Sequence, residues 1–375
     1  MNSALVIVLL MLISLPAFAQ AGSSAQAGVD TTEPFWKSPV MVGESVLFVK
    51  RGGQASGKLL FAPIKIIEAK SSSGKLAYLE GKDYKVKPGT NEIIIPSGSA
   101  IPVIPAKTLT PPLGSQPFDL KRRDKKGDIL FGEKDEYANM QVVFTYEHET
   151  GNWGPVPPVY AKQDIPKVLQ KLNDGEPVSI VFFGDSITAG GNASKFVNVP
   201  PFLPAYPERV IQNLEHAYKS KITYKNYSVG GMTAEWGLKN VDKVAAEKAD
   251  LVVLGWGMND SSGKSPRPIK DFVRDIGGQM DIINKKNADT EFIVVASMLP
   301  NEDCYWTNPQ VLLDYRDTVR KLSGGGVAIA DLTSVWEALL KTKNYLDMTG
   351  NGVNHPNDWG HRLYADVVSA LLIKQ

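Results

Sequence analysis

The chain has 375 residues and a formal net charge of +1, from 41 Lys and Arg against 40 Asp and Glu. This balance excludes a field strong enough to attract nucleic acid or anionic lipid by charge alone. Because 43% of the residues are hydrophobic and 22% are charged, the composition is typical of a globular protein and not of a disordered one. The single cysteine, Cys304, excludes an intramolecular disulfide and a zinc site built from cysteines.

The first residues have the pattern of an export signal. Leu5–Leu15 is an almost unbroken apolar run, too short to span a bilayer, and Ala17-Phe18-Ala19 is a small-x-small cleavage pattern. We therefore expect residues 1–19 to be a signal peptide, residues 20–33 to be a disordered lead-in, and the protein to be secreted or periplasmic. No Lys or Arg precedes Lys37, so the usual positive charge is missing and a retained anchor is the alternative. No later segment is long and apolar enough to be transmembrane.

Residues 34–153 predict a small β-sandwich-like accessory domain. Short runs rich in β-branched and aromatic residues alternate with Gly, Pro, Ser and Asn, at Val46–Lys50, Phe61–Ala69, Leu76–Leu79, Glu92–Ile95 and Gln141–Tyr146. The proline-rich segment 102–117 is a loop or an edge, because proline cannot donate to a central strand. We expect residues 154–176 to form a linker and a first helix.

From residue 177 to the end, apolar strands alternate with helices. Continuous apolar runs predict strands buried on both faces of a parallel sheet, at Ser179–Phe183, Ile222–Val229, Leu251–Gly255, Phe292–Met298 and Val327–Leu332. Helical stretches follow at Tyr206–Lys219, Ala234–Lys248, Ile269–Asn287, Gln310–Leu322, Ser334–Lys341 and Asn357–Ile373. This alternation predicts a three-layer α/β/α domain over residues 177–375, with its ligand site beyond the carboxyl ends of the strands.

Polar residues and glycines stand at those strand ends. Ser186, in Gly-Asp-Ser-Ile-Thr, follows the first strand, Gly231 follows the second, and Asn259 follows the third. His355 lies in a polar turn before the last helix. Each segment alone is as typical of a helix cap or a tight turn. Together they supply a nucleophile, oxyanion donors and a base, which are the groups that acyl transfer requires.

The other histidines are weaker candidates for a base. One lies in the β-rich part, one lies mid-helix among charged residues, and one lies within the last helix, namely His148, His216 and His361. A surface or packing role is expected for His361.

The four blocks resemble the SGNH (GDSL-type) hydrolase family, whose letters match here as Ser186, Gly231, Asn259 and His355, in that order. The resemblance covers roughly residues 177–375. It implies a flavodoxin-like fold, no metal or other cofactor, and ester hydrolysis through a covalent acyl-serine. It also implies that His355 is the base and that the oxyanion hole is made of the N–H groups of Ser186 and Gly231 and the side chain of Asn259. Asp185 would organise the turn, and Asp185, Trp256 and Trp306 are candidate substrate-binding residues.

The sequence departs from the family at the third triad member. The family usually has an Asp three residues before its His, where this chain has Gly352. Asp347, from the preceding loop, and a backbone carbonyl that orients the ring in a Ser–His dyad are the leading candidates. Asp358 and Asp303 are further possibilities.

Three features favour a carbohydrate substrate: the export signal, the β-rich domain, and aromatic residues expected near the rim of the site. These aromatic residues are Trp256, Tyr305, Trp306 and Trp359. We therefore expect a serine esterase that removes short acyl groups, such as acetyl, from a polysaccharide. The alternatives are a short-chain lipid or aryl esterase, and a catalytically weakened polysaccharide-binding protein. The sequence indicates no nucleic-acid partner and predicts no oligomeric state.

Overall fold

The structure is a computed structural model that describes residues 33–154 and 157–374. The predicted signal peptide and almost all of the predicted lead-in lie outside these residues. Within the described part of the chain, no helix is both long and apolar enough to cross a bilayer. The described residues fall within one compact unit, so the predicted boundary at residues 154–176 stays a prediction.

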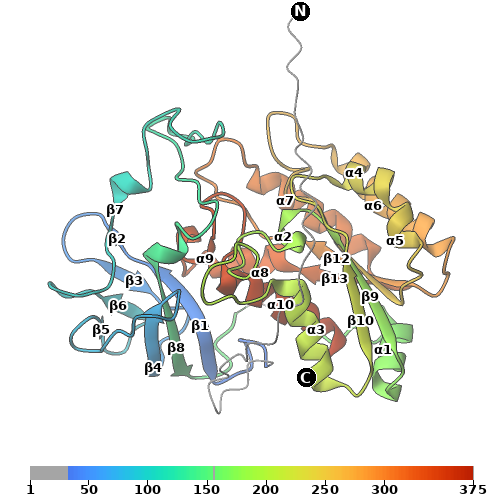
Figure 1. Ribbon diagram of the computed structural model, residues 1–375, viewed down its shortest axis with the longest axis horizontal. Coiled ribbons are helices and arrows are strands. Elements are labelled where there is room, and N and C mark those ends of the chain that lie inside the picture. Colours follow the sequence, from blue (N-terminus) through green and yellow to red (C-terminus); the bar gives the residue numbers. More distant parts are fainter. Residues whose placement is uncertain (1–32, 155–156, 375) are drawn as a thin grey trace, which may run out of the picture. The chain divides into compact units, whose positions relative to one another are not determined.

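A five-stranded parallel sheet forms the centre of the C-terminal part, as the sequence predicts, in the order β10-β9-β11-β12-β13 (Figure 1). Its strands are β9 (Val178–Gly184), β10 (Ile222–Asn226), β11 (Leu251–Gly255), β12 (Glu291–Ala296) and β13 (Val327–Asp331). Every residue of β11 and β12 is buried, which explains their continuous apolar sequence. The edge strand β10 ends at Asn226, earlier than expected, so the following residues form a loop at the edge of the sheet.

Helices cover both faces of this sheet. The ring of Phe182 lies 6.1 Å from Tyr206, whereas the next residue, Phe183, lies 6.0 Å from Trp236. Because successive side chains of a strand point to opposite faces, Tyr206 in α3 and Trp236 in α4 lie on opposite sides. The helices are α1 (Pro166–Asp174), α2 (Ser186–Ala189), α3 (Tyr206–Ala217), α4 (Ala234–Asn240), α5 (Asp242–Ala245), α6 (Ile269–Asn284), α7 (Pro309–Val319), α8 (Leu332–Leu339), α9 (Tyr345–Met348) and α10 (Asp358–Leu372).

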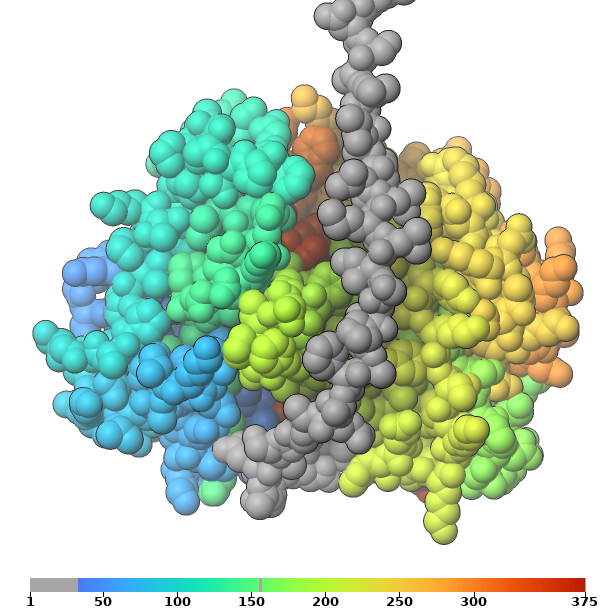
Figure 2. All heavy atoms as spheres, in the orientation of Figure 1, coloured from blue at the N-terminus to red at the C-terminus, as the bar shows by residue number. Residues whose placement is uncertain are grey.

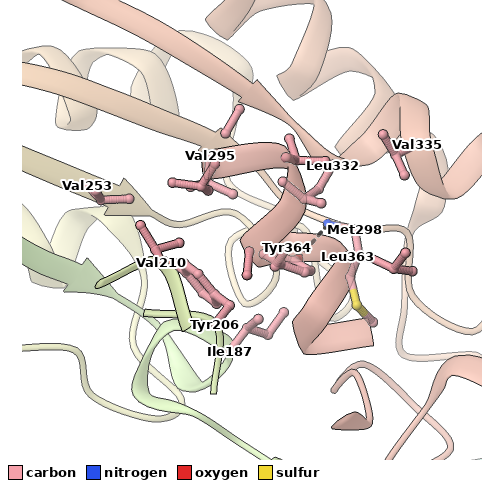
Figure 3. Close-up of a cluster of buried hydrophobic side chains, with 14 of the residues drawn as sticks. Ile187, Tyr206, Val210, Val253, Val295, Met298, Leu332, Val335, Leu363 and Tyr364 are labelled. Atoms are coloured by element: carbon pink, nitrogen blue, oxygen red, sulfur yellow. Dashed lines mark hydrogen bonds between the residues drawn. The ribbon is translucent and has the colours of Figure 1, made fainter. Parts of the chain in front are cut away.

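The last helix, α10, is anchored on the same face as α3. Figure 3 shows Leu363 and Tyr364 of α10 beside Tyr206 of α3, over the sheet. The rings of Tyr206 and Tyr364 are 5.1 Å apart, and the hydroxyl of Tyr364 accepts a hydrogen bond of 2.9 Å from the N–H of Met298. Asn357 caps α10 by accepting from the N–H of Gly360, so the turn just before the helix is held at the edge of the sheet.

Two three-stranded antiparallel sheets form the N-terminal part, in the orders β1-β8-β4 and β3-β6-β5, in agreement with the predicted β-rich fold. Their strands are β1 (Val40–Leu47), β3 (Ser56–Lys58), β4 (Pro63–Ser71), β5 (Lys85–Val86), β6 (Glu92–Ile94) and β8 (Gln141–His148), and a separate pair joins β2 (Val49–Lys50) to β7 (Ile104–Pro105). The sheets meet closely, because a Cβ added to Gly57 of β3 would lie 2.5 Å from Val46 of β1. The expected strand Leu76–Leu79 forms only isolated bridges, since Leu76 and Leu79 are exposed and bury no apolar face.

A buried ionic cluster joins the two parts. Lys343, between α8 and α9, lies with its Nζ 2.6 Å from Oε1 of Glu44 in β1 and donates a 2.6 Å hydrogen bond to the carbonyl of Lys58. The carboxylate of Asp347 accepts from the N–H of Leu47 at 2.8 Å. Burial raises the pKa of Glu44 and of Asp347, and the charge of Lys343 opposes this rise. Removing Lys343 would therefore leave two acids without their cation.

We expect Lys343→Met to lower the free energy of unfolding at pH 7 by about 3 kcal/mol or more, because breaking a buried ion pair leaves an uncompensated charge. Lys341→Met, at an exposed position of the same loop, is the matched control. Urea unfolding followed by circular dichroism measures both. Equal effects of the two substitutions would contradict a stabilising role for the cluster.

Candidate active site

The structure brings the expected nucleophile and base into contact. Ser186 is the first residue of α2, whose N-cap, Asp185, accepts a 3.0 Å hydrogen bond from the N–H of Ile187. His355 lies in the turn between α9 and α10. Ser186 Oγ is 2.8 Å from His355 Nε2. This is hydrogen-bond distance, so the imidazole can accept the hydroxyl proton.

The other nitrogen of His355 contacts an amide. His355 Nδ1 lies 2.7 Å from Asn192 Oδ1. The Asn192 Nδ2 donates to the carbonyls of Gly350 at 3.1 Å and Gly132 at 3.3 Å. Because those carbonyls only accept, the amide nitrogen must face them and the amide oxygen must face the ring. Nδ1 therefore carries the proton, and Nε2 is left to accept from Ser186.

The expectation that Asp347 contacts His355 is wrong. Its carboxylate accepts from the N–H groups of Leu47 and Asn344, at 2.8 and 3.0 Å, and caps α9. The carbonyl-supported dyad is also wrong, since a side chain fills that position. The remaining acids are engaged elsewhere: Asp358 accepts from the N–H of Ser194, and Asp303 pairs with Arg122.

The sequence reasoning missed Asn192 because it sought a carboxylate close to His355 along the chain. Asn192 comes instead soon after Ser186, in Ala-Gly-Gly-Asn. Its backbone φ of 61° lies in the left-handed region, which Asn tolerates better than most residues. No sequence signal linked this residue to the histidine.

The expected oxyanion donors lie on neighbouring loops. Gly231 has a φ of 76°, and a Cβ added to the adjacent Gly230 would lie 3.6 Å from Ser186 Cβ. Asn259 Nδ2 donates to the carbonyl of Met232 at 2.9 Å, which ties its side chain to the loop of Gly231 and leaves a second amide hydrogen. Within the described residues, no acceptor is found for the N–H of Gly231. The loop of Gly231 thus lies beside Ser186, and Asn259 is bonded to that loop.

Asp185 organises the turn and is almost fully buried. It is only 2% exposed, and burial, together with the nearby charge of Asp260, raises its pKa to about 7. Asp260 accepts from the N–H groups of Ala234 and Gly257, and burial raises its pKa to about 6. The expectation of Asp185 as a substrate-binding residue is therefore wrong, and its expected role in the turn agrees with its contacts.

His361 supports the turn that carries Asn192. Its Nε2 donates to the carbonyl of Gly191 at 3.0 Å, and its Nδ1 accepts from the N–H of Tyr206 at 3.4 Å. Burial lowers the pKa of His361 to about 3, so the ring is uncharged near neutral pH. Burial also lowers the pKa of His355, to about 4. A neutral His355 is the form that can take a proton from Ser186.

Two of the four expected rim aromatics are exposed. Trp306 and Tyr305 are 42% and 45% exposed, and the Trp306 ring lies against Gly263, where an added Cβ would be 3.2 Å from it. Trp256 and Trp359 are buried, and Trp256 Nε1 donates to Gln279 at 3.0 Å. The expectation that Trp256 binds substrate is therefore wrong.

The N-terminal part reaches the loops at the sheet edge. Arg122 pairs with Asp303 at 3.1 Å, and Arg123 Nε donates to the carbonyl of Glu302 at 2.6 Å. Figure 2 shows red C-terminal atoms beside the teal N-terminal part. Within the described residues, no three His, Cys, Asp or Glu side chains form a group that could hold a metal ion.

Residues 182–363 match the model of the GDSL-like Lipase/Acylhydrolase family. This segment belongs to that family. The match contains Ser186, Gly231, Asn259 and His355, so the sequence resemblance is confirmed, and it assigns the segment to the ester-cleaving acylhydrolases. None of the curated proteins matches the chain in sequence.

Three solved structures are similar to part of the chain. A two-domain esterase active on acetylated mannans is 21% identical, with a TM-score of 0.46, and the match covers 57% of this chain and 53% of that one. The acetyl xylan esterase AlAXEase is 20% identical, with a TM-score of 0.41 and coverage of 51% and 98%. A lipolytic G-D-S-L family protein from Veillonella parvula is 19% identical, with a TM-score of 0.40 and coverage of 51% and 95%. The chain thus spans about half the length of the mannan esterase.

Gly191 is the position where a methyl group should disturb the base. A Cβ added there would lie 2.9 Å from His355 Nδ1, so we expect Gly191→Ala to displace the imidazole. A displacement of about 1 Å should slow the reaction of Ser186 with an organophosphorus reagent about 10²-fold. Gly277→Ala, with nothing within 4 Å of the new methyl group, is the control and should react normally.

The reaction of Ser186 with an organophosphorus reagent should continue at acidic pH. Protonation of His355 removes the base, and burial lowers its pKa to about 4, so the rate should fall only as the pH drops towards about 4. Stopped-flow measurement of the rate from about pH 3.5 to about pH 8 tests this. A midpoint at the ordinary histidine value, about 6.5, would contradict it.

Proposed function

We propose that the protein is an exported serine esterase that removes short acyl groups, such as acetyl, from a polysaccharide. The observation that carries the proposal is the 2.8 Å contact between Ser186 Oγ and His355 Nε2, with the second ring nitrogen already bound to Asn192. A hydroxyl joined to an oriented, neutral imidazole is an activated nucleophile.

In the first half of the reaction, Ser186 Oγ attacks the carbonyl carbon of the ester while His355 Nε2 takes the hydroxyl proton. The negative charge that develops on the carbonyl oxygen is stabilised by the N–H groups of Ser186 and Gly231 and by the free amide hydrogen of Asn259. The tetrahedral intermediate collapses, His355 protonates the leaving alcohol, and an acyl-serine remains.

In the second half, water replaces the alcohol. His355 takes a proton from the water, which attacks the acyl-serine carbonyl, and the same donors stabilise the oxyanion. Collapse returns the proton to Ser186 Oγ and releases the carboxylic acid. Apart from the ester and the water, every group in these steps belongs to the chain.

A carbohydrate leaving group agrees with the exposed aromatic residues near the site. Tyr305 and Trp306 offer flat apolar faces of the kind on which sugar rings stack. The carbonyl of Trp306 accepts from the N–H of Gly263, in the loop that follows Asn259. The N-terminal part contacts the segment that carries these aromatic residues, through Arg122 with Asp303 and Arg123 with Glu302. Export rests on the N-terminal sequence, outside the described residues.

A short-chain lipid or aryl ester is the second candidate substrate. The loop that carries Asn192 also exposes Phe196, Phe202 and Leu203, at 59%, 51% and 40%. Exposed apolar side chains beside a reactive serine favour an apolar acyl or alcohol group. The two candidates differ in the leaving group and share the chemistry.

We expect wild-type protein to hydrolyse p-nitrophenyl acetate and Ser186→Ala to lose this activity. Asn259→Ala should lower kcat about 10²- to 10³-fold, because one oxyanion donor is lost. Asn240→Ala, on the outer helix α4, is the control. An unimpaired Ser186→Ala variant would overturn the proposed nucleophile.

Acetylated xylan, acetylated peptidoglycan and phospholipid then separate the substrates. Release of acetate from a polysaccharide, at a higher kcat/KM than from p-nitrophenyl acetate, is the expected result. Cleavage of phospholipid alone would overturn the carbohydrate proposal and leave the esterase mechanism standing.

A further inference from the structure

Asn192 is closely surrounded by the backbone of Gly132, Gly191 and Gly350, which we call the cradle. A Cβ added to Gly350 would lie 2.4 Å from Asn192 Cβ, and one added to Gly191 would lie 2.9 Å from His355 Nδ1. The loop holds Asn192 at a φ of 61°, where side chains are uncommon. Glycines on both sides therefore permit the approach of this residue to the imidazole, and backbone strain of this kind concentrates at functional sites.

The cradle selects an amide over a carboxylate. The carbonyl oxygens of Gly350 and Gly132 lie 3.1 and 3.3 Å from the same atom, Nδ2 of Asn192. A carboxylate would place an oxygen there, and its negative charge would meet two carbonyl dipoles with no donor between them. The site is thus built for a neutral acceptor in the place where a charged one is usual.

One wall of the cradle comes from the N-terminal part. Gly132 donates its N–H to the carbonyl of Asn351 at 3.1 Å, so its own carbonyl is held beside Asn192. The Tyr137 hydroxyl donates to Leu130 at 2.9 Å and packs against Gly352, where an added Cβ would lie 2.2 Å away. The segment 130–137 therefore fixes both the histidine turn and the amide.

We propose that Asn192, held by the carbonyls of Gly132 and Gly350, is the positioning residue of His355 and takes the place of the triad carboxylate. The proposal rests on the proposed esterase function. In it, Asn192 selects the tautomer with the proton on Nδ1, so that Nε2 always faces Ser186, and it adds no charge to the site.

The surroundings of His355 make this testable by titration. Burial accounts for its lowered pKa. His361, whose Nε2 donates to the carbonyl of Gly191, is a titratable ring that interacts electrostatically with His355. Introducing a carboxylate at residue 192 would place an anion against Nδ1 and stabilise the imidazolium. A merely structural role of Asn192 would not produce this change.

The test combines histidine NMR with kinetics on the full chain. Long-range ¹H–¹⁵N spectra give the tautomer and titration midpoint of His355, whose signals are those missing in His355→Gln. We expect the Nδ1–H tautomer in the wild type, and Asn192→Ala should lose this preference and lower kcat about 10²-fold. Asn192→Asp should raise the titration midpoint and the acid limb of kcat/KM by about 1 pH unit or more.

Asn198→Asp is the matched control, because Asn198 lies in the same loop at a φ of 58° and is exposed. It should change neither readout. The proposal is overturned if Asn192→Asp titrates like Asn198→Asp, or if Asn192→Ala keeps both tautomer and kcat. Should Asn192→Asp not fold, the tautomer and kcat of Asn192→Ala decide alone.

The NMR readout needs no turnover, so the two proposals fail separately. An Nδ1–H tautomer that depends on Asn192, in a protein that cleaves no ester, would overturn the function and leave the positioning role. Ester hydrolysis that depends on Ser186, together with a His355 tautomer that does not change when residue 192 is substituted, would overturn the positioning role and leave the function.

Discussion

The 2.7 Å hydrogen bond between Asn192 Oδ1 and His355 Nδ1 decides which nitrogen of the imidazole faces Ser186. An imidazole has one donor and one acceptor when neutral, so engaging one nitrogen defines the role of the other. The amide can serve because its own nitrogen is held by the carbonyls of Gly132 and Gly350. The reactivity of the serine thus depends on a backbone arrangement two contacts away.

The fold makes this arrangement by gathering loops at one edge of a parallel sheet. Ser186 follows β9, Gly231 follows β10 and Asn259 follows β11, and parallel strands end at the same edge. His355 reaches that edge because α10 packs against α3 through Tyr206 and Tyr364. Local strain is concentrated in the loop after Ser186, where Asn192, Asn198 and Phe202 have positive φ. Its contacts with the histidine turn and with α10 hold that loop in place.

The N-terminal part has a structural role at the site, whatever else it binds. Its segment 130–137 supplies the Gly132 carbonyl and packs Tyr137 against Gly352. Farther from the serine, the buried pair of Lys343 and Glu44 joins the same two parts, with Asp347 beside it. Asp347 thus stabilises the segment that precedes the histidine turn. This explains why an acid lies close to His355 along the chain without contacting the imidazole.

The sequence by itself determined the strand–helix alternation, the β-rich N-terminal part and four of the site residues. These are local or ordered signals: apolar runs, turn glycines, and Ser186, Gly231, Asn259 and His355 at the ends of elements. Only the tertiary structure decided what His355 Nδ1 contacts and which aromatic residues reach solvent. Asn192 and Gly132 meet His355 through loop conformation and long-range packing, and burial separates Trp256 from Trp306. The order of residues along the chain does not give the distance between them in space, because that distance depends on how the elements pack.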